Sequence, residues 1–223
     1  MVEFVAAFLV FIGAHVLPAR TGLRDALINR LDRRAYLILY SLLSLALLAW
    51  LISAATRAPH IALWPTTRLS VIIALVLTAL AAVLLSCGAT RPQPVSVSLR
   101  GGMVDPRHPG ILALTRHPIL WAFFLWSVGH LIANGDLVGV VMFASFAAFC
   151  VVSGPALEKR AHQRLPGDVY AAAMSVNSGP FGERLRRALS PRLAVEAAAG
   201  IVLFALMLVF HGDLIGVDPL AYF

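Results

Sequence analysis

Two histidines in apolar segments are the first candidates for chemistry. His15 lies in Phe-Ile-Gly-Ala-His-Val-Leu and His130 in Trp-Ser-Val-Gly-His-Leu-Ile, and neither segment contains a carboxylate. A neutral imidazole has one donor and one acceptor, and both need partners. Within a membrane such a residue either joins helices through hydrogen bonds or binds a metal or haem, for which imidazole is a common ligand. Two such residues in one small chain favour a ligand pair, and a hydrogen bond between helices stays the alternative for each.

A third histidine belongs to the triplet Arg116-His117-Pro118. The residue before a proline avoids the α conformation, and proline favours the first helical position. His117 is therefore expected to be the N-cap of a helix that follows it. Free N–H groups at this end favour an anion, and Arg116 strengthens the preference. A carboxylate suits this place, from a haem propionate or from S-adenosylmethionine; the alternative is capping with contact to lipid headgroups.

The composition predicts an all-α, polytopic membrane protein that positions these residues on helices. Hydrophobic residues make up 60% of the chain, charged residues 13%, and the mean hydropathy is +0.84. A soluble domain is about half apolar and a quarter charged. A membrane helix needs about 20 residues. Six apolar runs predict about six transmembrane helices: 2–17, 35–53, 69–87, 119–133, 137–154 and 193–210.

The basic residues predict the orientation. All but two of the 18 lysines and arginines lie in segments 18–34, 88–118 and 155–192, which alternate with the other connections. Cytoplasmic loops are rich in Lys and Arg, so both termini are expected in the periplasm. Anionic headgroups account for the net charge of +7. Membrane lipids are therefore the expected partners, and no nucleic acid is needed.

No linker divides the chain, so residues 1–223 are expected to form one membrane domain. Segment 155–192 is expected to be cytoplasmic and interfacial, with an amphipathic helix over 156–165 that ends at Pro166-Gly167. The last transmembrane helix is expected at about 193–211. The 17 arginines against one lysine suit a GC-rich bacterial genome. A bacterial chain with six spans is expected in the inner membrane.

Three segments together resemble the NnrU family of bacterial membrane proteins. The first is His15 followed by Arg24, and the second is Tyr36 followed by Ser-Leu-Leu-Ser-Leu at 41–45. The third, 116–136, runs from Arg-His-Pro-Ile-Leu-Trp through Trp-Ser-Val-Gly-His to Asn-Gly-Asp. The resemblance covers about residues 2–160. It implies a link to nitrite and nitric oxide metabolism in denitrifying bacteria.

The NnrU family is similar to plant 15-cis-ζ-carotene isomerase, a membrane haem b enzyme. In that enzyme a first-helix histidine and the histidine that ends a Trp-x-x-x-His stretch hold the iron. The resemblance therefore implies haem b, with His15 and His130 as iron ligands and His117 as the alternative second ligand. The isomerase has a cysteine three residues before its second histidine, where this chain has Ser127. A serine supplies no thiolate ligand.

The same Arg-His-Pro element is similar to that of the isoprenylcysteine and methanethiol methyltransferases. There it helps to hold S-adenosylmethionine at the cytoplasmic face. Glu158 and the segment Gly-Asp-Val-Tyr at 167–170 are similar to the C-terminal Glu…Gly-x-x-Tyr element of those enzymes. A methyltransferase that binds S-adenosylmethionine is therefore the first alternative, because one fold can host unrelated chemistries. A non-catalytic membrane scaffold or assembly factor is the second.

The preferred interpretation is a haem b protein with further residues around the cofactor. Arg116 and His117 are expected to clamp a propionate, with Arg24 as a more distant candidate. Trp121 and Trp126, together with Phe124, are expected to wall the pocket. The expected small ligand is an apolar substrate or nitric oxide, and a homo-oligomer is compatible with the sequence. Whether the protein catalyses a reaction is left open.

Depth in the membrane tests the ligand pair. At about 1.5 Å per residue, His15 lies about 18 Å from Glu3 at the expected outer end of its helix. His130 lies only about 9 Å from Asp136 at the outer end of its own helix. The two levels differ by about 9 Å before any tilt. His117 would differ from the level of His15 by about 12 Å in the other direction. Because membrane helices tilt by up to about 40°, these differences exclude neither His130 nor His117 as the partner of His15.

Overall fold

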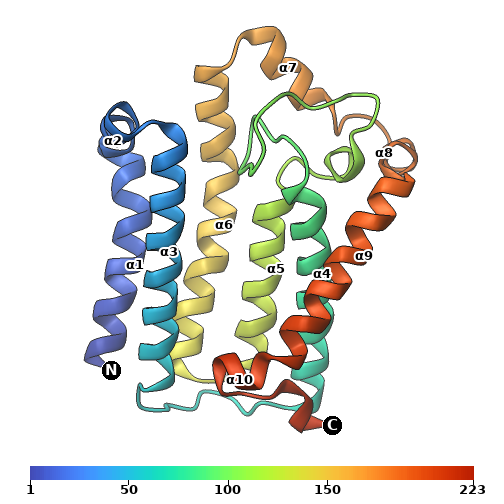
Figure 1. Cartoon of the computed structure of the whole chain (residues 1–223). Coiled ribbons are helices and arrows are strands. Elements are labelled where there is room, and N and C mark those ends of the chain that lie inside the picture. The colour runs from blue at the N-terminus through green and yellow to red at the C-terminus, as the bar shows by residue number, and fades with distance from the viewer. The chain divides into compact units, whose positions relative to one another are not determined.

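A computed structural model describes the backbone of residues 1–223 and all side chains except those of Ala19, Arg20 and Arg33. Arg20 and Arg33, two of the arginines counted in segment 18–34, lie outside the described side chains. The elements in chain order (Figure 1) are α1 (Val2–Arg20), α2 (Leu23–Leu31), α3 (Arg33–Thr56), α4 (Arg68–Ala89), η1 (Gly110–Ala113), α5 (Pro118–Ala133), α6 (Leu137–Arg164), α7 (Gly167–Ser175), α8 (Phe181–Ala188), α9 (Pro191–Val209), α10 (His211–Ile215) and η2 (Pro219–Tyr222).

The predicted all-α membrane fold is confirmed, since each of the six apolar runs lies in a helix: α1, α3, α4, α5, α6 and α9. Within the described chain α3, α4, α6 and α9 are long and apolar enough to cross a membrane. Val2–Pro18 and Leu23–Leu31, bent by 75°, together give a fifth candidate. The remaining run forms α5, which is shorter at 16 residues. Six crossings and periplasmic termini stay predictions.

The expected separate helix over 156–165 is wrong in its beginning. These residues continue α6, which runs without interruption from Leu137 to Arg164 and contains Pro155. Helices tolerate proline where other contacts satisfy the freed backbone carbonyl. The predicted break at Pro166-Gly167 is confirmed, because α7 begins at Gly167 with Pro166 as its N-cap.

The chain divides into two compact units. The N-terminal unit comprises Met1–Leu63 with Asp136–Met142, and the C-terminal unit comprises Trp64–Gly135 with Phe143–Phe223. In the N-terminal unit α1 packs on α3. Their paired ends are joined by Glu3, whose Oε1 accepts hydrogen bonds from Arg57 at 2.6 Å and from Trp50 Nε1 at 3.4 Å.

In the C-terminal unit α4 packs against both α5 and α9, and glycines allow both contacts. A Cβ at Gly129 of α5 would lie 3.2 Å from the Ala74 carbonyl oxygen of α4. A Cβ at Gly200 of α9 would lie 2.6 Å from the Val83 Cα of α4, closer than real Cβ contacts allow. Small residues let membrane helices approach to backbone contact.

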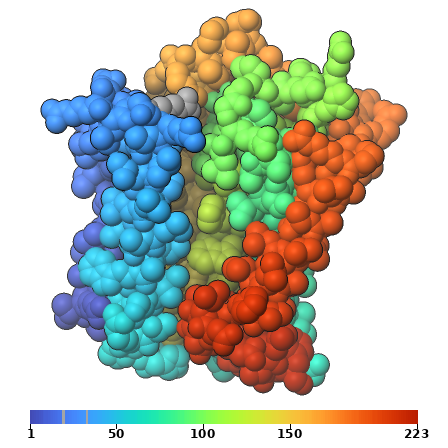
Figure 2. Space-filling model, viewed as in Figure 1, coloured from blue at the N-terminus to red at the C-terminus, as the bar shows by residue number. Residues whose placement is uncertain are grey.

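The long helices expose apolar side chains, as expected for surfaces that face lipid. Leu45 on α3, Val152 on α6 and Val209 on α9 are 63%, 68% and 68% exposed. Figure 2 shows the C-terminal residues, in red, as a continuous band on one face of their unit. In lipid such exposure carries no hydrophobic cost, so the membrane assignment explains it.

Candidate functional site

His15 lies on α1 in the N-terminal unit, partly buried. Its Nδ1–H donates to the Phe11 carbonyl at 2.7 Å. Its ring packs on the Phe11 ring, with centroids 4.3 Å apart, and meets the edge of Tyr40 at 5.7 Å. Because a carbonyl only accepts, Nδ1 must carry the proton, which leaves the Nε2 lone pair for another partner. The described residues provide no hydrogen bond to this Nε2.

His130 has the same arrangement in the last turn of α5, in the C-terminal unit. Its Nδ1–H donates to the Trp126 carbonyl at 2.8 Å. The Trp126 and Phe143 rings lie 4.8 and 5.0 Å from the imidazole, centroid to centroid. These rings hold the imidazole in apolar surroundings, and Nε2 again has no hydrogen-bond partner among the described side chains. Trp126, one of the residues expected to wall a pocket, thus contacts the His130 ring.

Sequence reasoning missed another histidine, whose ring lies beside that of His130. His211, the first residue of α10, has its ring centroid 6.4 Å from that of His130, at an interplanar angle of 30°. Its Nδ1–H donates to the Val217 carbonyl at 2.6 Å. In the sequence His211 is simply the residue that follows the apolar run 193–210. The pairing depends on how α9 lies along α4, which no local pattern encodes.

Arg116 and His117 lie at the other end of α5, where His117 is the N-cap and Pro118 the first helical residue, as predicted. Arg116 Nε and His117 Nε2 both contact the same carboxylate oxygen, Glu158 Oε1 of α6, each at 2.8 Å. Arg116 also donates to Asn177 Oδ1 at 3.0 Å, and His117 Nδ1 bonds Ser96 Oγ at 2.8 Å. The chain's own carboxylate therefore holds the position at which the sequence expected a carboxylate ligand.

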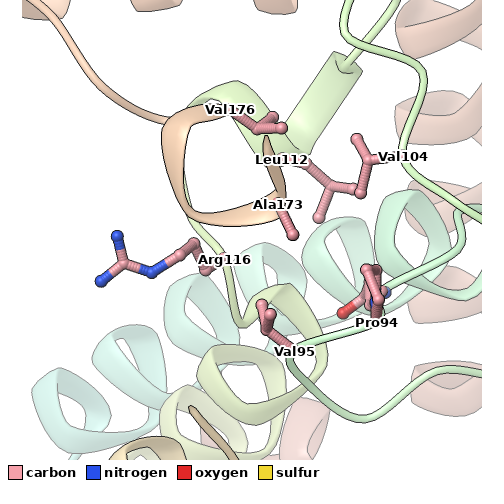
Figure 3. A pocket seen from close by; sticks show the side chains of 8 residues that line it. Pro94, Val95, Val104, Leu112, Arg116, Ala173 and Val176 are labelled. Atoms are coloured by element: carbon pink, nitrogen blue, oxygen red, sulfur yellow. The ribbon is translucent and has the colours of Figure 1, made fainter. Parts of the chain in front are cut away.

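A cavity of about 10 Å³ borders this network; Gln93, Pro94, Val95, Val104, Leu112, Arg116, Ala173 and Val176 line it. Figure 3 shows the Arg116 guanidinium extending away from the apolar lining residues. About one water molecule needs this much space. A nucleoside-sized cofactor would have to separate these segments in order to enter.

Other predicted residues have more ordinary contacts. Arg24, on α2 of the N-terminal unit, is 45% exposed and lies 3.5 Å from the Asp25 carboxylate. Trp121 is 47% exposed and meets Phe124 edge to face at 5.3 Å. Ser127 is fully buried and donates to the Phe123 carbonyl at 2.7 Å. Its hydroxyl is thus bonded within its own helix.

A buried ionic network, which the sequence analysis did not identify, joins α4 to α9. The Glu196 carboxylate, 6% exposed, accepts from Thr90 Oγ1 at 2.6 Å, Arg91 at 3.0 Å and Arg192 Nε at 2.8 Å. Arg91, 5% exposed, also donates to the His108 carbonyl at 2.6 Å. The only sequence signal was one acidic residue inside an apolar run.

The loop before α5 is shaped around Arg91. Gly110 has φ +55°, and a side chain there would overlap the Arg91 guanidinium. Arg91 also lines a cavity of about 190 Å³ with Asp105, His108 and Arg192. A hydrogen bond from His108 is the main cause that lowers the pKa of Asp105. The Asp105 carboxylate is thus bonded within its own loop.

Among the described residues no group of three or more His, Cys, Asp or Glu side chains is placed to hold a metal ion. Axial ligation of haem needs only two side chains, and a ligating histidine normally donates its other N–H to a carbonyl or carboxylate. His15, His130 and His211 have this arrangement. The chemistry of each imidazole therefore fits ligation of an iron atom.

Comparison with known protein families gives a match over most of the chain. The family described as NnrU protein matches residues 3–219, nearly the whole chain. The match extends well beyond the region 2–160 that the motifs indicated and includes α9 and α10. No curated protein and no solved structure matches the chain.

Proposed function

The chain belongs to the NnrU family of membrane proteins, and we propose that it binds haem b in the inner membrane of a bacterium, with His15 and His130 as axial ligands. The observation that carries the proposal is the shared state of the two imidazoles. Each donates Nδ1–H to the carbonyl four residues earlier, and the described residues make no hydrogen bond to either Nε2.

These hydrogen bonds would do two things for a ligand. They fix the tautomer and the ring orientation, and they raise the basicity of Nε2. Trp126 and Phe143 pack on the His130 ring and would keep water from it. Haem would supply redox chemistry or binding of a small molecule such as nitric oxide, and the protein would tune it through ligand identity and burial.

The roles of the remaining residues follow from their contacts. For Arg116 and His117 to clamp a propionate, Glu158 would have to share or give up its two partners. Ser127 offers a hydroxyl where the similar isomerase has a thiol, so any isomerase-like chemistry would proceed without a thiolate. A role in nitrogen-oxide metabolism, or in haem-dependent redox chemistry, rests on the resemblance alone.

The absorption spectrum of protein purified from haem-supplied cells tests the proposal. Two axial imidazoles give a six-coordinate, low-spin iron with a sharp Soret band. His15→Ala and His130→Ala should each lose haem or become high-spin, whereas the exposed His60→Ala should behave as wild type. A colourless wild-type preparation would contradict haem binding.

A methyltransferase is the second candidate, and the network at Glu158 favours it. Arg116, His117, Glu158 and Asn177 bring charged and polar groups from several segments to one end of the C-terminal unit. Titration of haem-free protein with S-adenosylmethionine tests this function. Micromolar binding that His117→Ala abolishes and His60→Ala retains would support it. Protein that binds neither haem nor S-adenosylmethionine would favour a scaffold or assembly factor.

A further inference from the structure

The larger of the two cavities has arginines on its lining, at the ends of two long helices. It measures about 190 Å³, and Arg91, Arg192, Asp105 and His108 contribute to its wall. Arg91 is two residues after the end of α4, and Arg192 is the second residue of α9. Figure 1 shows these two helix ends at the same end of the C-terminal unit. One water molecule needs only about 10–15 Å³ of such space, so the cavity has room for a group of the size of a phosphate.

Both arginines have N–H donors to offer such a group. A guanidinium has five N–H donors and no acceptor. Arg91 uses two of them, on Glu196 Oε2 and on the His108 carbonyl. Arg192 also uses two, on Glu196 Oε1 and on the Thr90 carbonyl. Three donors of each arginine therefore have no acceptor among the described residues, and one of them is the buried Arg91 Nε. Buried donors without an acceptor are uncommon and costly.

Arg91 is fixed in place by the protein, whereas Arg192 is free to adjust. The Arg91 side chain is 6% exposed and is held by the Glu196 carboxylate at 3.0 Å. The Gly110 backbone lies so close that a Cβ there would overlap the guanidinium. The Arg192 side chain is 59% exposed. A fixed guanidinium beside an adjustable one suits an anion with several oxygens, because arginine donates to phosphate through paired N–H bonds.

The charges around the cavity suit an anion of a single charge. Arg91 and Arg192 share one carboxylate, Glu196, so these three groups carry one positive charge in excess. The Asp105 carboxylate lines the cavity and opposes an anion, although its Oδ2 already bonds His108 Nδ1 at 3.0 Å. A phosphodiester carries one negative charge, whereas a phosphate monoester carries about 1.5 to 2 at pH 7. The balance therefore favours the phosphodiester.

We infer that this cavity binds a phosphate group of one negative charge through Arg91 and Arg192. The group belongs either to the phosphodiester of a membrane phospholipid, whose headgroup lies at the level of helix ends, or to free inorganic phosphate. None of the residues assigned to haem or to S-adenosylmethionine lines this cavity. The inference is therefore independent of the proposed function.

Lipid binding is measured on the delipidated full-length protein in a nonionic detergent, with native mass spectrometry to count the bound molecules. The probes are dioleoylphosphatidylglycerol, which is a phosphodiester, and dioleoylglycerol, which has the same tails without the phosphate. Wild type should bind one molecule of the phospholipid in preference to dioleoylglycerol. Arg192→Gln should weaken phospholipid binding about tenfold, because it removes a charged donor.

Two further variants separate binding from loss of structure. Asp105→Asn removes the opposing charge and should raise the affinity for the phospholipid about threefold. A destabilised protein would not produce such a gain. Arg186→Gln removes an equal positive charge from an exposed position on α8, outside the cavity, and should leave the affinity unchanged.

Titration with inorganic phosphate in the absence of lipid, followed by line broadening in phosphorus NMR, distinguishes the two sources. Broadening that Arg192→Gln removes and Asp105→Asn increases would support the inference with free phosphate as the ligand. The same responses in lipid binding alone would support it with a phospholipid. The inference would be overturned if wild type, Arg192→Gln and Asp105→Asn bind both probes alike, or if neither probe binds, because the cavity would then hold only water.

Discussion

Removal of the Glu196 carboxylate should destabilise the C-terminal unit more than any surface change. Glu196→Ala removes the acceptor for three donors and leaves the Arg91 guanidinium, whose side chain is 6% exposed, without its counter-charge. Breaking one partner of a buried ion pair costs about 3–5 kcal/mol, because the remaining charge stays desolvated. An unfolding equilibrium constant should therefore rise by roughly a hundredfold or more.

A double variant separates the destabilisation caused by an unpaired Arg91 from the net contribution of the Arg91–Glu196 ion pair to stability. If the orphaned charge dominates, replacing both residues, Arg91→Met with Glu196→Met, should cost less than Glu196→Ala alone, because pairs replaced by apolar residues are often close to neutral. Thr90→Val removes one neutral donor to Glu196 and should cost only about 1 kcal/mol. The exposed pair of Arg24 and Asp25 is the matched control, since Asp25→Ala should change stability by less than about 1 kcal/mol.

Unfolding by sodium dodecyl sulfate in mixed micelles, followed by tryptophan fluorescence, measures these differences. Glu196→Gln should fall between wild type and Glu196→Ala, since an amide keeps the shape and one acceptor but not the charge. The reasoning would be refuted by a Glu196→Ala protein within about 1 kcal/mol of wild type, or by a double variant as unstable as the single one.

Three further outcomes follow from the fold. Reporter fusions after Phe223 and within 54–65 should report the periplasm, and fusions near Ser98 or Asn177 should report the cytoplasm. A cytoplasmic C-terminus would contradict the predicted topology. Gly200→Leu should separate α9 from α4 and lower the thermal unfolding temperature in detergent, whereas Gly182→Leu, whose position is open, should not; equal losses would refute the close-contact argument. Haem-loaded His117→Ala should keep its low-spin spectrum and lose haem faster if His117 clamps a propionate, and an unchanged loss rate would remove that role.

Much of the helical framework could be predicted from local sequence. Each long helix coincides with an apolar run, because in lipid the backbone must satisfy its own hydrogen bonds. The start of α5 followed from the restriction that Pro118 places on His117. The continuation of α6 through Pro155 was not predictable, because tertiary contacts decide whether a proline ends a membrane helix.

The candidate site was only partly predictable for a different reason. His15 and His130 stood out because polar residues are rare in apolar runs. Glu158 as the partner of His117, and His211 as the neighbour of His130, depend on contacts between distant segments. The sequence places Glu158 41 residues after His117, and no periodicity connects the two. Charge and hydropathy point to single residues, whereas the contacts between residues far apart in the sequence are decided by how the helices pack.

The glycines that face α4 have a consequence for how the helices recognise one another. Lipid tails are as apolar as leucine, so hydrophobicity cannot tell a helix which neighbour to choose. Gly129 and Gly200 instead present missing side chains to two different stretches of α4, at Ala74 and at Val83. The choice of neighbours in this unit thus depends on side-chain volume. A helix can pack closely on α4 only where it has a glycine opposite the α4 backbone, at Ala74 for α5 and at Val83 for α9.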